Sequence, residues 1–160
     1  MCIRDRNTSN LSLLNGAQIT AGVFGTGDAG NVTINASGDT TFQGVDPNSG
    51  NPSGILNNVA PGGVGDAGDT FVTTANLSLI DGGSITSDVF GEGNAGSITI
   101  NASDAVNISG TTIFDETTRF SRISSNTGTD VVGNAGSVEV VIQELMWWGM
   151  QGVLKLKQIL

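Results

Sequence analysis

The feature that most constrains this chain is a long internal repeat. Residues 10–44 read NLSLLNGAQITAGVFGTGDAGNVTINASGDTTFQG, and residues 76–110 read NLSLIDGGSITSDVFGEGNAGSITINASDAVNISG. The two stretches align without a gap, each position of the first matching the one numbered 66 higher, and 19 of the 35 positions are identical. A repeat of this length indicates supersecondary units that stack on one another, because a single unit cannot bury its apolar face alone.

A shorter signal inside the repeat predicts strands. The triplet Asx-Ala-Gly begins at Asp28, Asp66, Asn94 and Asn134. Each triplet precedes an alternating segment, the period-two pattern of a strand with one buried face. The residues predicted to share that face are Val32 and Ile34, Thr70 and Val72, Ile98 and Ile100, and Val138 and Val140. We expect the triplet to form a corner, since Gly and Asn accept backbone conformations that Val does not.

The segments between these signals predict an all-β fold. The chain has 24 Gly among 160 residues, and short β-branched runs separate the residues that favour turns. Further strands are expected at residues 10–14, 18–21, 40–43, 76–80, 84–87 and 105–109. If the repeat holds three coils, each averages about 22 residues, which suits a parallel β-helix whose turns stack on one another. Asn, Ser and Thr at equivalent corners would then form hydrogen-bonded ladders.

Two segments break the repeat and are candidates for loops. Residues 44–65 are rich in turn formers and contain all three prolines. Residues 111–133 carry the most varied chemistry, including Asp115, Glu116, Arg119 and Arg122. Insertions in stacked folds usually map to one exposed face, often the binding face, so we take these four charged residues as candidate exposed binding-loop residues. The alternative is a solvated loop with charge pairs three or four residues apart.

Both ends of the chain differ from the repeat. Residues 1–6, MCIRDR, do not match it, and we interpret them as translated sequencing-adapter DNA that stands outside the fold. Residues 143–160 contain both Trp and both Lys. Reading the codons of residues 146–152 from the third base gives Val-Val-Gly, then Asn, Asp, His or Tyr, then Ala, then Gly or Arg. This set includes the VVGNAG motif of residues 131–136, so we interpret this tail as frameshifted. Its helix-favouring residues predict a helix. Residues 7–142 then hold the repeats.

Charge and cysteine content exclude several partners. The net charge is −9, and between residues 7 and 142 only Arg119 and Arg122 are basic. Such a surface repels nucleic acid and anionic membranes, so we expect no nucleic-acid partner and no membrane insertion. The single Cys2 and the absence of His leave no disulfide framework and no Cys/His zinc site.

The repeated phrase NLSLxxGxxIT…GxGNAGxxTINAS is similar to the tandem repeats of filamentous haemagglutinin-like exoproteins, particularly those of cyanobacteria. The resemblance covers residues 7–141. It implies a right-handed parallel β-helix (β-solenoid), of which this chain is a fragment of a longer repeat array. It further implies two-partner secretion through an outer-membrane partner transporter, and display or release at the bacterial cell surface. No catalytic motif belongs to these repeats, so the resemblance assigns no site residue.

We therefore expect a structural or adhesive surface segment that mediates attachment or aggregation, and not an enzyme, with no catalytic residue, cofactor or metal. One alternative is a carbohydrate-active β-helix, related to polysaccharide lyases or glycoside hydrolases, that uses the insertion at 111–133. Another is calcium binding by the glycine-rich corners at Asp28 and Asn94. That alternative is weaker, because the G-G-x-G-x-D pattern of calcium-binding nonapeptides is absent.

Overall fold

The computed structural model describes residues 4–129, 131–144 and 152–158. These residues form an all-β fold without a helix, and most strand pairs are parallel. Within the described ranges, accordingly, no helix has the length and apolar character needed to cross a membrane.

The repeat signal marks one face of the molecule. On this first face β1 (Arg4–Thr8), β4 (Val32–Ala36), β7 (Thr70–Ile80), β9 (Ile98–Ser109) and β13 (Val138–Glu144) lie side by side in parallel. Their register equates residues 4, 32, 70, 98 and 138. Hydrogen bonds between equivalent positions show the same intervals, so the chain returns after 28, 38, 28 and 40 residues. We call each such passage of the chain a rung.

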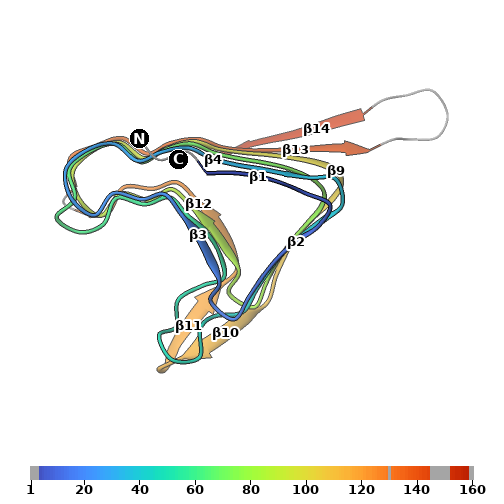
Figure 1. Ribbon diagram of the computed structural model, residues 1–160, viewed down its shortest axis with the longest axis horizontal. Coiled ribbons are helices and arrows are strands. Elements are labelled where there is room, and N and C mark those ends of the chain that lie inside the picture. The colour runs from blue at the N-terminus through green and yellow to red at the C-terminus, as the bar shows by residue number, and fades with distance from the viewer. Residues whose placement is uncertain (1–3, 130, 145–151, 159–160) are drawn as a thin grey trace.

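Each rung contributes strands to two further faces. The second face holds β2 (Leu11–Leu14), β5 (Asp39–Gln43) and the later halves of β7 and β9, which continue around the corner. The third face is a parallel sheet of β3 (Gln18–Thr20), β6 (Gly54–Leu56), β8 (Ser84–Thr86) and β12 (Arg122–Ser124). In projection the three faces follow the sides of a triangle (Figure 1).

The register corrects the expected length of the coil. The repeated unit is two rungs, of 38 and 28 residues, and not three shorter coils. Within one rung, the element that occurs three times is the strand, with one strand on each face. The strand positions expected from the alternation are confirmed, with bounds that differ by one or two residues or with two expected strands joined in β7 and β9.

The interior of the triangle is the main apolar core. Along β4 the exposure alternates, so that Val32 and Ile34 are fully buried. Ile19, Ile55 and Ile85 stack at equivalent positions of the third face and close the same core. A smaller cluster of Val23, Val59, Ala67 and Val89 lies in the segments that lead from the third face to the next rung.

The glycine of the Asx-Ala-Gly triplet has a different role from the one expected. A Cβ at Gly68, Gly96 or Gly136 would overlap the carbonyl oxygen of the equivalent glycine one rung earlier. The positive φ angles lie instead at the glycine before the triplet, as at Gly65 (142°) and Gly93 (133°). The triplet glycine is therefore required for close stacking, and the preceding glycine makes the turn.

Polar ladders join successive rungs, as predicted. The Asp66 Oδ1 atom accepts hydrogen bonds from the backbone N and the Nδ2 of Asn94, at 2.7 and 3.0 Å. The Asn94 Oδ1 atom in turn accepts from the N and Nδ2 of Asn134, at 3.1 and 2.9 Å. Each side-chain oxygen thereby accepts a hydrogen bond from the backbone N–H of the equivalent corner residue in the next rung. This N–H lies outside the strands, so strand pairing does not satisfy it.

The C-terminal tail forms a strand where it is described. β14 (Gly152–Gln158) pairs antiparallel with β13, so the helix expected in residues 143–160 is wrong for this segment. The Leu-Lys-Leu-Lys sequence alternates with period two, and the free edge of β13 offers unpaired backbone groups. Both Trp lie outside the described residues, as do Met1, Cys2 and Ile3. Residues 4–6, expected to stand outside the fold, lie in β1.

Candidate functional site

Both insertions open from the same corner, between the second and third faces. The first and third rungs make short turns there, at Asn15 and Gly16 and at Asp81 and Gly82. The second rung inserts a loop at residues 45–52, and the fourth inserts the antiparallel hairpin of β10 (Thr111–Phe114) and β11 (Thr117–Phe120). The loop lies within residues 44–65, where one was expected, and β6 in the same segment continues the third face. We call this region, which lies at the foot of Figure 1, the insertion corner.

The two insertions contact each other across the intervening rung. The α-carbon of Gly50, in the loop, faces the ring of Phe114 so closely that a Cβ would overlap it. A Cβ on Gly82, in the turn between them, would lie 2.9 Å from a methyl of Val45 and 3.3 Å from one of Thr112. Chain segments that are distant in the sequence therefore form one continuous surface.

The four candidate residues divide into two groups. Asp115 and Glu116 form the two-residue turn at the tip of the hairpin, exposed and with φ angles of 48° and 58°. The hairpin register sets Arg119 opposite Thr112, and no ion pair joins the tip to either arginine in the described part of the chain. The charge pairs expected for a solvated loop are thus not found, because an extended strand separates residues three or four apart by about 10–13 Å.

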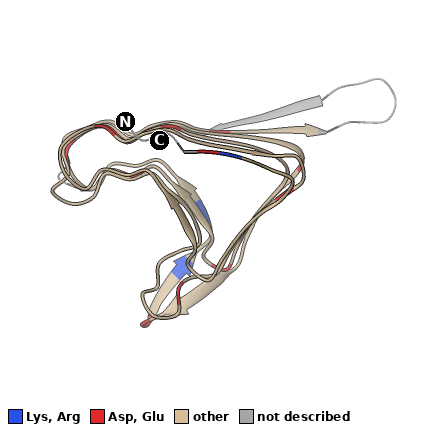
Figure 2. Cartoon of the chain, viewed as in Figure 1, with Lys and Arg blue, Asp and Glu red and all other residues tan. Residues whose placement is uncertain are grey.

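Arg119 and Arg122 line one shallow pocket of about 110 Å³. Thr118 and Phe120 share the hairpin side of this pocket, and Pro52, Gly82 and Ser84 come from the two preceding rungs. Phe120 is 64% exposed, whereas Ser84 is 1% exposed and its Oγ has no hydrogen-bond partner in the described structure. Figure 2 shows the two arginines as the blue segments of β11 and β12 at this corner.

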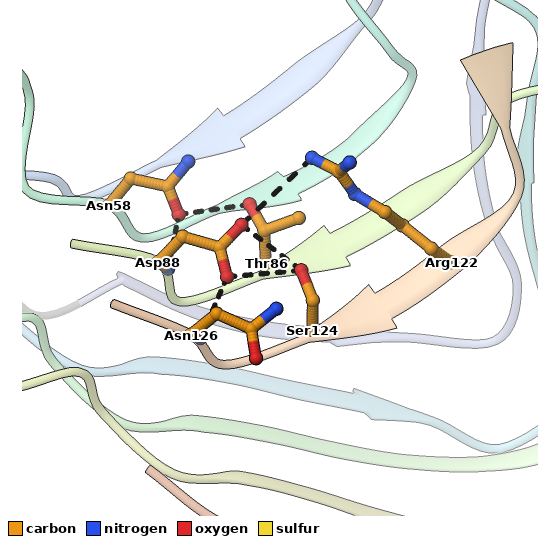
Figure 3. A network of polar contacts seen from close by, with 6 residues as sticks. All are labelled: Asn58, Thr86, Asp88, Arg122, Ser124 and Asn126. Carbon is orange, nitrogen blue, oxygen red and sulfur yellow. Dashed lines mark hydrogen bonds and ion pairs between the residues drawn. The ribbon is translucent and has the colours of Figure 1, made fainter. Parts of the chain in front are cut away.

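A polar network anchors Arg122 to the third face. Its Nη2 lies 3.9 Å from Oδ2 of Asp88, whose side chain is 7% exposed (Figure 3). The Ser124 hydroxyl lies 3.0 Å from both carboxylate oxygens, and the backbone N of Asn126 donates to Oδ1 at 2.9 Å. One rung earlier, Asn58 Oδ1 accepts from the Asp88 backbone N at 2.8 Å. The carboxylate is thus fixed by residues of the next rung, and it lies within ion-pair distance of the arginine that lines the pocket.

The sequence indicated the arginines but not the rest of the pocket. Ser84 and Arg122 are distant in the sequence and become neighbours only through the register of β8 and β12. Pro52 belongs to a segment expected only as a loop. The one sequence signal for Phe120 was its place in the second insertion.

The corners proposed as calcium sites use their oxygens within the ladders. Asp28 Oδ1 accepts a hydrogen bond of 3.0 Å from the backbone N of Asp66. Among the described residues, no three or more His, Cys, Asp or Glu side chains form a group able to hold a metal ion. The arrangement accounts for these Asx residues as ladder acceptors.

The insertion corner offers two guanidinium groups, an aromatic ring and two hydroxyls, of which the buried one has no partner in the described structure. This chemistry suits binding of an anion with an apolar portion. Comparisons with protein-family models, with curated proteins and with solved structures find no match to this chain.

Proposed function

We propose that this chain is a segment of a secreted bacterial surface filament, built as a right-handed parallel β-helix, that mediates attachment or aggregation. In this proposal the described rungs are part of a longer repeat array of the filamentous haemagglutinin type. The resemblance of residues 7–141 to those exoproteins supports the family. It also supports export through an outer-membrane partner transporter and a location at the cell surface.

The observation that carries the proposal is the stacking of non-identical rungs in one register. The rungs differ in length, yet their strands stay aligned because most of the extra residues leave at the insertion corner. A fold of this kind lengthens by adding rungs, since each rung contacts its neighbours only. Such a scaffold suits a protein that must project a surface from the cell.

The insertion corner supplies the surface for attachment. On β4 and β7 the exposed residues are Asn35, Phe71 and Thr73, none of which is charged. The corner differs from these strands in its positive charge, because it gathers both arginines of the repeat region in one pocket. Chemical contrast of this kind is typical of a binding surface.

Bead retention tests the proposal. Beads coated with the full chain should remain on polysaccharide-coated glass under shear flow, or clump together, without releasing reducing sugar ends. Beads coated with albumin serve as the control. Release of reducing ends would favour the carbohydrate-active alternative, in which the same corner cleaves its ligand. If the coated beads neither remain on the glass nor clump together, this result contradicts an adhesive function.

A further inference from the structure

We propose that the pocket at the insertion corner binds the carboxylate of a uronic acid unit in an anionic polysaccharide. This inference rests on the proposed adhesive function and names the chemical class of its ligand. Three features of the pocket favour such a ligand: its charge, its buried hydroxyl and its aromatic wall.

The charge of the pocket is opposite to that of the chain. The net charge is −9, yet Arg119 and Arg122 line the same pocket. A guanidinium group is planar and offers two parallel N–H donors, the geometry that a carboxylate accepts. Two such groups on one small pocket favour an anionic ligand.

Both arginines keep donors for a ligand. Arg122 approaches Asp88 at 3.9 Å, which is too long for a hydrogen bond, and its side chain remains 57% exposed. Asp88 is already occupied by Ser124 and Asn126, which are nearer to it than the guanidinium. Arg119 forms no ion pair within the described residues. The network therefore orients Arg122 without saturating it.

The buried hydroxyl is the independent indication of a ligand. Ser84 lines the pocket and is 1% exposed, and its Oγ lacks a partner among the described residues. Leaving a buried hydroxyl unsatisfied is unfavourable, and such groups mark places where a missing partner belongs. An oxygen of a bound saccharide would supply this partner once the side chains that line the pocket adjust.

The aromatic wall and the size of the pocket favour a sugar acid. Phe120 is 64% exposed and presents an apolar ring, against which the C–H face of a sugar ring packs. A volume of about 110 Å³ holds a carboxylate and part of one sugar ring. The acidic surface repels a polymer with several charges on each sugar more strongly than one with a single carboxylate.

Calorimetric titration of the full chain with hexagalacturonate tests the inference. We expect binding that weakens with added salt, weaker binding of heparin-derived hexasaccharide, and none of neutral cellohexaose. Arg119→Gln and Arg122→Gln should each weaken binding about tenfold, the loss expected for one charge-assisted hydrogen bond. Arg6→Gln is the matched control, because it removes the same charge from an exposed position on β1 and should leave the affinity unchanged.

Ser84→Ala separates a binding role from a structural one. This variant should weaken hexagalacturonate binding about threefold to tenfold by removing a ligand hydrogen bond. Its melting temperature should not fall, because the hydroxyl that is lost has no partner among the described residues of the free protein. Unchanged affinity in Ser84→Ala would overturn the role of the hydroxyl.

Different results would contradict binding at the pocket and the proposed adhesive function. Binding at the pocket is overturned if hexagalacturonate does not bind, or if Arg6→Gln weakens binding as much as the pocket variants. Beads that still attach under flow would then leave the adhesive function standing. Binding accompanied by cleavage would instead support the pocket and contradict the non-catalytic filament.

Discussion

At the scale of single residues, the tip of the hairpin holds two side chains in a conformation that favours glycine. Asp115 and Glu116 both have positive φ, which a type I′ hairpin turn of two residues requires at both central positions. Asp tolerates this region because its short side chain bonds locally, whereas Glu gains nothing comparable. The third rung uses the more usual pair, Asp81 and Gly82, for its short turn.

Glu116→Gly should therefore stabilise the protein. Relief of the left-handed conformation outweighs the greater freedom of glycine in the unfolded chain, so we expect a gain of about 0.5–1 kcal/mol. Urea denaturation followed by circular dichroism measures it. Thr117→Gly, at the next residue, has no positive φ to relieve and should destabilise. A lower stability of Glu116→Gly would contradict the account of the turn.

A second effect at this scale concerns pH. The backbone N–H of Asn48, and then the hydroxyl of Ser49, donate to the carboxylate of Asp46 at 2.9 and 2.7 Å and lower its pKa from the ordinary value. A lowered pKa in the folded state stabilises the protein above the ordinary Asp value of about 3.9, and this contribution is lost as the pH falls through the folded pKa.

Asp46→Asn should accordingly lower the melting temperature at neutral pH, and the difference from the wild type should shrink as the pH falls below about 4. Thermal melts of both proteins across this range provide the measurement. Ser49→Ala, which removes one donor to the carboxylate, should reduce the same pH dependence. A difference that stays constant with pH would show that the charge of Asp46 has no role.

At the scale of elements, stacking of rungs depends on a column of glycines. Gly30, Gly68, Gly96 and Gly136 occupy one position in successive rungs, and each of the last three lies close to the carbonyl oxygen of the one before. Beside this column, the buried hydroxyl of Ser87 accepts from the N of Gly96 at 3.1 Å and donates to the carbonyl of Gly68. The corner is therefore too narrow for a side chain.

Gly96→Ala should destabilise the protein by about 3 kcal/mol, because the new Cβ forces two rungs apart at a hydrogen-bonded corner. Gly25→Ala is the control, since Gly25 has open space and no positive φ, and it should be nearly neutral. Urea midpoints of the two variants give the comparison. Equal midpoints would mean that the corner relaxes at little cost.

At the scale of the whole molecule, the unit of growth is the pair of rungs. The stretch of residues 32–97 spans one repeat unit and contains one rung with an insertion and one without. Residue 98, which follows this stretch, occupies the same register position on the first face as residue 32, which begins it. Such a unit is expected to be added without disturbing its neighbours.

Insertion of a second copy of residues 32–97 after Ser97 should therefore lengthen the protein by two rungs, about 10 Å at the usual spacing of strands. Small-angle X-ray scattering measures the length, and thermal unfolding should show no loss of stability. Inserting residues 32–53, a third of the repeat unit, is the control and should disturb the stack. An equal outcome for both insertions would contradict the two-rung unit.

Local patterns in the sequence are sufficient to predict the class of fold and the positions of the strands. Alternation of Val32 and Ile34 with polar residues is a local property, fixed by which side chains one face can bury. The spacings between the triplets equal those between the paired strands that follow them, because the same motif recurs at the same corner. The two arginines were identified as the unusual chemistry of the repeat region.

How the strands are shared among rungs, and which side chains line the pocket, depends on long-range pairing in the tertiary structure. Counting strands did not reveal that three make one rung, because this depends on which backbones pair across long stretches of sequence. The tail was expected to be helical from local propensity, but the edge of β13 pairs with it as a strand. Ser84 and Arg122 are likewise brought together by the register of β8 and β12. Register is a long-range property, and no local pattern specifies it.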